Sequence, residues 1–374
     1  MATNSLRRWL AVHSWSSLIS TIVLLILFVS GLPLIFKSEL ESLLGYGGGT
    51  PVADQTQAAS ADAIVQSAQQ AFPDKAIHYV VWEKDMPGRV LLNIGDTPTS
   101  HFSTNFNVVM DEHTGALVEA DPSPLAFFID LHTTLTMGPF GYTLMGLMAL
   151  LMIIALVSGA VVYAPHMRRL EFGEIRQHSP RLRWLDLHNL IGMVALGWAV
   201  VVGGTGMINS WGEYILMGWR NSELSAIEAD YQQRTALPTE RVPLDQVLQT
   251  ALAAVEDKEL YYIAAPGSFM STPYHYSVYL RGNDPSTEFL LQPVLVDAQS
   301  GELTAAPQVP GYISALMLSQ PLHFGNYGGM PLKILWVVFD ALTIILLGSG
   351  LYLWWVRRHS SRKTERKELN VQAI

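Results

Sequence analysis

The sequence contains no cysteine among its 374 residues. Disulfides, Cys-ligated metal clusters and covalently attached c-type haem are therefore excluded. Charged side chains are also scarce, at 15% of the residues against 49% hydrophobic. The chain has neither a G-x-G-x-x-G fingerprint after a strand nor a Walker loop, and the glycine cluster at 45–49 matches neither pattern. No dedicated nucleotide or dinucleotide domain is expected.

Four apolar windows are long enough to cross a lipid bilayer. They cover residues 15–36, 142–163, 190–211 and 334–355, with aromatic residues at nearly all their ends. About 20 residues, at 1.5 Å per residue, span the roughly 30 Å hydrocarbon core, and aromatic belts are typical of membrane interfaces. The sequence therefore predicts a membrane protein with an α-helical bundle of four transmembrane helices.

Basic residues gather at the N-terminus, in the loop 165–187 and in the tail 356–374. Because Lys and Arg are enriched in cytoplasmic segments, we expect both termini in the cytoplasm and two large segments, 37–139 and 212–333, on the other side. The first span is followed by Pro33 and Phe36 instead of small residues. It is therefore expected to be an uncleaved anchor rather than a secretion signal.

These windows predict eight parts of the chain. They are the N-terminal segment with the first span (1–36), a first external module (37–139), the second span (140–164), a basic loop (165–187), the third span (188–211), a second external module (212–333), the fourth span (334–355) and a basic tail (356–374). A glycine-rich linker is expected at 45–51.

Both external segments contain a helix followed by strands. The first has a helical composition at 58–72 and strand-like runs at 77–83, 89–94, 106–110 and 116–119. The second has the same order, with a helical run at 244–255 and strand-like runs at 260–264, 275–281, 294–296 and 302–304. Asp-x-x-Thr/Ser-Gly turns stand at matched places, 111–115 and 297–301. The repetition predicts an internal duplication with two α+β modules.

Four histidines repeat at fixed distances from small residues. His132 and His323 each precede a Ser-Gly pair by 26 and 27 residues, while His13 and His188 each precede a glycine by 18. A pseudo-two-fold axis along the membrane normal would bring His13 to His188 and His132 to His323. A single histidine near a membrane interface is usually structural, but four at matched offsets predict two ligand pairs.

This layout resembles the PepSY-associated transmembrane proteins and, within them, the inner-membrane ferric-siderophore reductases of Gram-negative bacteria. The residues that carry the likeness extend along nearly the whole chain and are His13, 111–115, Leu131, His132, Ser158, Gly159, Leu187, His188, Gly192, 297–301, 322–325 and Gly350. The resemblance implies periplasmic PepSY-like modules and two non-covalent haem b groups.

The histidines are the expected iron ligands of those haems. His13 and His188 would bind the haem iron on the cytoplasmic side, and His132 and His323 the haem iron on the periplasmic side. Four residues after the first two ligands stand Ser17 and Gly192, which are expected to leave a recess for a flat macrocycle. The other histidines are expected at the surface, and they are His78, His101, His113, His166, His178, His275 and His359.

Asp340 interrupts the fourth span, whereas the matched residue of the second span is Ala149. A carboxyl group at this depth in a membrane is costly and is a candidate functional, catalytic group, near a haem edge or in proton uptake. The structural alternative is a protonated carboxyl group that is hydrogen-bonded to a neighbouring helix.

The resemblance implies an oxidoreductase that moves electrons to a ferric siderophore docked between the two periplasmic modules. Reduction would release iron, because hard oxygen donors hold Fe(III) better than Fe(II). The electron donor could be a quinol, a loosely bound flavin or a separate protein. Candidate contacts with the siderophore are Phe140, Phe324, Asn326 and Tyr327.

Two other functions remain open from the sequence. One is a non-enzymatic PepSY protein, in which the spans anchor modules that inhibit a peptidase or sense a ligand. The other is a haem electron carrier that delivers electrons to a periplasmic redox protein instead of a siderophore.

Overall fold

The computed structural model describes residues 3–44, 58–84, 86–100, 104–118, 123–167, 171–232 and 240–372, with side chains up to residue 359. The linker expected at 45–51, His101, Glu119, Arg168 and Arg169 lie outside the described residues. The chain forms two compact units. The helical unit comprises Met1–Ile35, Phe127–Trp211 and Leu322–Ile374, and the sheet unit comprises Phe36–Ala126 and Gly212–Pro321.

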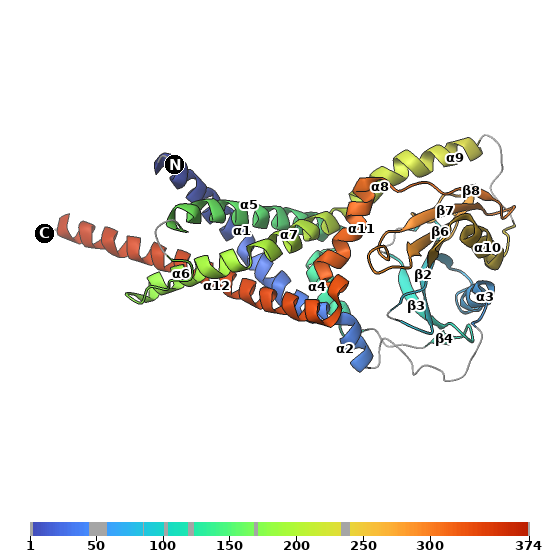
Figure 1. The fold of residues 1–374 in the computed structure, drawn as a ribbon, viewed down its shortest axis with the longest axis horizontal. Coiled ribbons are helices and arrows are strands. Elements are labelled where there is room, and N and C mark those ends of the chain that lie inside the picture. The colour runs from blue at the N-terminus through green and yellow to red at the C-terminus, as the bar shows by residue number, and fades with distance from the viewer. Residues whose placement is uncertain are drawn as a thin grey trace. The chain divides into compact units, whose positions relative to one another are not determined.

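Three long helices dominate the helical unit: α1 (Thr3–Ile35), α5 (Pro139–Met167) and α12 (Gly329–Gln372). Each contains an apolar stretch long enough to cross a membrane, at Asn4–Ile35, Pro139–Met167 and Asn326–His359. Helix α1 packs against both α5 and α12 (Figure 1). The protein is therefore a membrane protein with three candidate spans of unbroken helix.

The fourth apolar window is a bent pair of helices. Helices α6 (Pro180–Val194) and α7 (Leu196–Ser210) meet at Ala195 with a bend of 64°. Our expectation of a continuous span over 190–211 is therefore wrong, and the spans number up to four only if this pair counts as one. Gly192 and Gly197 flank the bend, and glycine is a poor helix former. The bend allows α6 to pack against α12 while α7 packs against α5.

Two shorter helices each end at a predicted ligand. Helix α4 (Ala126–Thr134) carries His132 in its last turn, and α11 (Gly311–Phe324) carries His323. After α11, Gly325 adopts a left-handed φ of 76° and a Cβ there would lie 3.0 Å from the ring of Trp336. Both the backbone conformation and the close ring favour glycine at this position. A short 3-10 helix, η3 (Asn326–Gly328), then leads into α12.

The sheet unit contains one antiparallel sheet of eight strands in the order β4-β3-β2-β1-β5-β6-β7-β8 (Figure 1). The strands are β1 (Ala76–Val81), β2 (Arg89–Gly95), β3 (Phe106–Asp111), β4 (Leu117–Val118), β5 (Lys258–Ala264), β6 (His275–Gly282), β7 (Gln292–Asp297) and β8 (Leu303–Ala305). The strand-like runs of the sequence match these bounds closely. Helices α3 (Ala61–Ala71) and α10 (Leu244–Ala254) bury their apolar stripes against this sheet.

The two predicted modules are joined. Strand β1 pairs with β5 through Tyr79 with Ala264, Val80 with Ile263 and Val81 with Tyr262. The two modules therefore share one continuous sheet, because their facing edge strands are hydrogen-bonded to each other. Joining two edges also satisfies backbone groups that would otherwise be exposed.

The starts of α3 and α10 are tied reciprocally. The Asp245 carboxylate accepts a hydrogen bond from the backbone N–H of Ala61 (3.0 Å), and the Asp62 carboxylate accepts from Leu244 (2.8 Å) and Asp245 (3.1 Å). An acidic side chain at a helix N-terminus satisfies free N–H groups and favours the helix dipole. Each helix thus receives a carboxylate from the other one, and α3 also has its own N-cap in Ser60, whose hydroxyl oxygen accepts a hydrogen bond from the backbone N–H of Ala63 (3.1 Å).

The matched turns after β3 and β7 have the same hydrogen bonds. Asp111 Oδ1 accepts from the backbone N–H groups of His113 and Thr114, and Asp297 Oδ1 accepts from Gln299 and Ser300. Burial opposes ionisation of Asp297, but these donors outweigh it and hold its pKa below the usual value. Each turn ends in a glycine with positive φ, 68° at Gly115 and 74° at Gly301.

Further helices of the sheet unit are α2 (Lys37–Leu43), α8 (Gly212–Trp219), the π-helix η2 (Arg220–Leu224) and α9 (Ser225–Gln232). Trp219 and Leu224 pack with Leu295 of β7 and Ile313 of α11. Leu295 of β7 therefore packs against these elements, while its neighbours Val294 and Val296 pack with α10.

Candidate functional site

The helical unit brings the four histidines together in two pairs. The ring centroids of His13 and His188 lie 6.4 Å apart, and those of His132 and His323 lie 6.2 Å apart. With about 2 Å from a metal to an imidazole nitrogen and about 1 Å more to the ring centroid, two opposed imidazoles on one metal have centroids roughly 6 Å apart. Both pairs have the spacing of two ligands on opposite sides of one metal ion.

In the first pair, a hydrogen bond to Nδ1 orients each ring. The Nδ1 of His13 lies 2.9 Å from the backbone oxygen of Ala155, and the Nδ1 of His188 lies 2.8 Å from the hydroxyl oxygen of Ser349. Metal-binding histidines usually donate their second nitrogen in this way, which fixes the tautomer and the ring orientation. Nε2 is then the nitrogen that could bind a metal.

The second pair repeats this pattern. The Nδ1 of His132 lies 2.9 Å from the backbone oxygen of Leu27 and 3.3 Å from the hydroxyl of Ser30. The Nδ1 of His323 lies 3.1 Å from the backbone oxygen of Val202 and 3.2 Å from the hydroxyl of Thr205. All four rings therefore present the same nitrogen for coordination.

Glycines on neighbouring helices leave room for the rings. A Cβ atom added to any of these glycines would lie 2.9 to 3.4 Å from the Cε1 atom of a predicted ligand, and the pairs are Gly31 with His132, Gly159 with His13, Gly206 with His323 and Gly350 with His188. Contacts this short require a neighbour to shift. The glycines at the repeated sequence offsets therefore lie directly against the imidazole rings and leave space for them. The sequence spacing did not reveal this contact.

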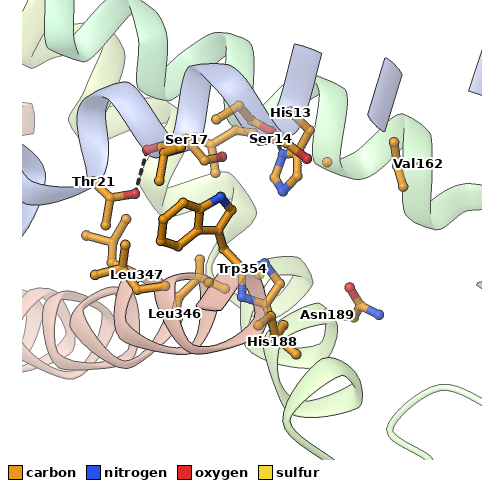
Figure 2. Close-up of a pocket in the computed structure, with 18 of the residues that line it drawn as sticks. His13, Ser14, Ser17, Thr21, Val162, His188, Asn189, Leu346, Leu347 and Trp354 are labelled. Carbon is orange, nitrogen blue, oxygen red and sulfur yellow. Dashed lines mark hydrogen bonds between the residues drawn. The ribbon is translucent and has the colours of Figure 1, made fainter. Parts of the chain in front are cut away.

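A cavity of about 340 Å³ adjoins the first pair. Figure 2 shows His13 and Ser17 on one side of it, with His188, Leu346 and Trp354 opposite. Its volume lies within the range typical of cofactor sites. Ser17 and Gly192, predicted to form a recess, both line this cavity.

The charges around the cavity are of one sign. Its lining includes Arg181 and Arg357, and no Asp or Glu among the described residues. The remaining lining is mostly apolar. Such a site suits a flat, largely apolar ligand that carries anionic groups, which the two guanidinium groups could bind.

The described residues contain no group of three or more His, Asp or Glu side chains that could hold a metal ion. Each histidine pair thus offers two ligands only. A metal between them would need its other ligands from a macrocycle, as in bis-histidine haem. The ligand spacing and the Nδ1 hydrogen bonds of both pairs fit such a group, and so does the cavity at the first pair.

Asp340 of α12 lies beside the second pair. A Cβ at Gly31 would be 2.9 Å from Cε1 of His132 and 3.9 Å from Oδ2 of Asp340, so the carboxyl group and the imidazole flank the same glycine. Asp340 is 5% exposed and its Oδ1 has no hydrogen-bond partner among the described residues. An unsatisfied buried acceptor is costly, and its place next to a candidate ligand favours the functional alternative.

The remaining histidines divide into two groups. His166, His178 and His359 are exposed, as predicted. The prediction is wrong for His78 and His275, which are 1% and 0% exposed in β1 and β6. His78 lies on the inward face of the alternating strand β1, and His275 lies on β6, which is buried on both faces, while their polarity suggested the surface. His113 is half-buried in the turn after β3.

The aromatic and amide residues predicted beside the second pair lie near the chain surface. Phe140 is 63% exposed and Phe324 is 46% exposed, with the Phe324 ring 5.8 Å from that of His323. Asn326 and Tyr327 belong to η3, where Asn326 is exposed. These side chains are placed where a docked molecule could reach them.

Comparison with family models gives one match, to the PepSY-associated TM region, which covers residues 10–357. The chain belongs to the PepSY-associated transmembrane family. A search of curated proteins found no match. The family match includes all four histidines, the four supporting glycines and Asp340.

Sequence reasoning missed part of this PepSY-associated site. The hydroxyl groups of Ser30, Thr205 and Ser349, which bond to the rings, lie at or next to the repeated small residues. Ser30 and Thr205 directly precede Gly31 and Gly206, and Ser349 directly precedes Gly350. The recurring dipeptide of a hydroxyl residue and a glycine was the signal that could have identified them.

Proposed function

We propose that this PepSY-associated protein is a dihaem b-type transmembrane oxidoreductase that delivers electrons to a ferric siderophore. The observation that carries the proposal is the presence of two histidine pairs with the centroid spacing of opposed ligands, 6.4 and 6.2 Å. Their Nδ1 hydrogen bonds and the supporting glycines give the same geometry twice. Structural histidines have no reason to share all three features.

In this function the chain holds each haem and controls its surroundings. A bound haem supplies one-electron chemistry by cycling between Fe(III) and Fe(II). His13 and His188 would hold one iron through Nε2, and His132 and His323 would hold the other. Arg181 and Arg357 would offer charge-assisted hydrogen bonds to anionic groups of the first haem. The apolar lining of the cavity would exclude water from the macrocycle.

The orientation and the substrate follow from charge and from metal chemistry. With the basic segments in the cytoplasm, the His13–His188 pair lies toward the electron donor and the His132–His323 pair toward the periplasm of a Gram-negative inner membrane. Hard oxygen ligands bind Fe(III) more tightly than Fe(II), so one electron loosens the iron of a siderophore. The donor would be a quinol, a flavin or a separate protein.

The matched positions of the histidines also support an internal duplication. Helices α3 and α10 with their strands have the same order, and the reciprocal caps of Asp62 and Asp245 relate the two copies. In this proposal the bent pair α6 and α7 is the fourth span of the bundle, and each haem lies between the two copies.

Pyridine haemochrome stoichiometry on the purified protein tests the proposal. We expect two haem b per chain, with the low-spin spectrum of bis-histidine ligation. A colourless protein from haem-replete cells would instead support an anchor whose sheet unit binds a peptidase or a ligand. One haem per chain would contradict the presence of two functional pairs.

Stopped-flow mixing tests the substrate. The dithionite-reduced protein should be reoxidised by ferric siderophores, with Fe(II) captured by ferrozine. The same siderophores loaded with redox-inert Ga(III) are the matched control and should leave the protein reduced. Reoxidation by a periplasmic redox protein, and by no ferric siderophore, would replace this substrate with a protein acceptor.

A further inference from the structure

A cluster of four aromatic side chains, Phe28, Trp198, Trp336 and Phe339, lies in the core of the helical unit. The ring of Trp198 is 6.1 Å from Phe28, 6.4 Å from Trp336 and 5.8 Å from Phe339, with which it stacks at 19°. Phe28 and Trp198 are 7% and 8% exposed. We call these four residues the aromatic bridge.

One end of the aromatic bridge reaches the first histidine pair. Phe28 lines the cavity that His13 and His188 share, together with its cluster neighbours Leu24 and Met152. A macrocycle held by that pair would therefore lie against the Phe28 ring or close to it.

The other end reaches the second pair. The Nε1–H of Trp336 donates a hydrogen bond of 3.1 Å to the backbone oxygen of His323. Leu27 and Val202, whose carbonyl oxygens bond to the rings of His132 and His323, pack against the same cluster. Phe28, Trp198 and Trp336 thus form a continuous series of ring contacts from one pair to the other.

The aromatic bridge does not follow the internal repeat. The residues at the matching offsets from the other histidines are Gly203 for Phe28, Val23 for Trp198, Met145 for Trp336 and Met148 for Phe339. The helical unit therefore has one aromatic connection between the pairs instead of two. If the aromatic residues served only the packing of a duplicated scaffold, both copies would be expected to contain them.

Packing alone explains Trp198 poorly. Its Nε1–H is buried without a hydrogen-bond partner among the described residues. Leaving a buried donor unpaired is costly, and phenylalanine or leucine would fill most of this space without that cost. A role that needs an extended π system at the centre of the aromatic bridge would explain why residue 198 is tryptophan.

We propose that the aromatic bridge is the path by which an electron passes between the two histidine-held centres, with Trp198 as its positioning residue. The inference rests on the proposed dihaem function. One electron leaves the reduced centre and arrives at the oxidised centre, and no bond forms, no proton moves and no ring is oxidised. Contacting π systems lower the tunnelling barrier relative to aliphatic side chains.

The test uses the full chain carrying both haems. Trp198→Leu removes the central ring, Trp198→Phe keeps a ring without the N–H, and Ile344→Leu, in the same cluster, is the matched control. Haem stoichiometry and both midpoint potentials are measured first. Transfer between the centres is then followed at their α-bands after flash photoreduction with a ruthenium dye.

We expect Trp198→Leu to slow transfer by about an order of magnitude at unchanged haem content and potentials, while Trp198→Phe and Ile344→Leu stay close to wild type. Wild-type transfer in Trp198→Leu would overturn the aromatic bridge and leave the dihaem function standing. A wild type without two haems would instead remove the proposed function. If Trp198→Leu loses haem, Phe28→Leu gives the same test at the other end of the path.

Discussion

The four paired histidines of the helical unit and the buried histidines of the sheet unit differ in what their rings face. Each paired ring faces a second histidine at about 6 Å and bonds through Nδ1 to a backbone carbonyl or a hydroxyl. In the sheet unit, His275 faces Tyr231 at 4.3 Å and bonds through Nδ1 to Thr272, while His78 bonds through Nε2 to Thr97.

This difference shows that burial alone does not identify a ligand. His275 is less exposed than any of the four paired histidines, yet no second imidazole lies against its ring among the described residues. His78 has a hydrogen-bonded ring nitrogen and a glycine, Gly95, against its ring, so the pairing with a second imidazole is what separates the candidate ligands from these histidines. Substitutions in both units can test that separation.

The largest effect is expected from removing a ligand. His13→Ala and His188→Ala should each deplete the same one of two haems, and His132→Ala and His323→Ala should each deplete the other, because each substitution removes one of the two protein ligands of the same iron. Haem content and absorption spectra measure this, with His275→Gln as the control that keeps both haems. Loss of one common centre in His13→Ala and His132→Ala would contradict the pairing.

The glycines that contact the paired histidine rings provide the next test. A Cβ at Gly206 would lie 3.1 Å from Cε1 of His323, whereas nothing lies within 4 Å of the same atom at Gly204. Gly206→Val should therefore displace the ring and deplete the haem of the His132–His323 pair, while Gly204→Val should retain both haems. Equal spectra for these two variants would mean that the glycine contact does not seat the ligand.

A smaller effect is expected at Asp340, which distinguishes the second pair from the first. Replacing a carboxylate beside an iron ligand with a neutral amide removes a negative charge that favours Fe(III). Asp340→Asn should raise the midpoint potential of the His132–His323 haem alone, by tens of millivolts, and slow turnover at unchanged haem content. Redox titration of both centres measures this, and two unaltered potentials would assign Asp340 a structural role.

The smallest effect concerns the sheet unit. Burial lowers the pKa of His275 to about 4, against about 6.5 in an unfolded chain. Below pH 6.5 the unfolded state therefore binds a proton that the folded state does not, so stability falls as the pH decreases toward 4. His275→Gln should show a weaker loss of thermal stability over this pH interval. An identical pH profile in both proteins would show that another group is responsible.

Local patterns of the sequence were sufficient for most elements. The predicted strands at 89–94 and 106–110 correspond to Arg89–Gly95 and Phe106–Asp111, because alternation and turn residues are local signals. The fixed offsets identified the four histidines that the structure places in two pairs. The spacing also contained the supporting glycines, although their contact with the rings could only be seen in three dimensions.

Long-range contacts were beyond the sequence. Nothing in the composition of β1 and β5 indicates that two strands so far apart in the chain pair with each other. In the sequence, Asp62 and Asp245 look like ordinary acidic residues in a first helical turn. Each carboxylate instead accepts hydrogen bonds from the start of the other helix, a contact that depends on the pairing of β1 with β5. The bend at Ala195 was missed because hydropathy is continuous across it.

The junction between β1 and β5 makes the two halves of the sheet unit dependent on each other. If the chain were cut between them, each fragment would expose an edge strand with unpaired backbone groups, and each helix would lose the carboxylate that it receives from the other half. The strand pairing and the exchanged carboxylates therefore tie the two halves together.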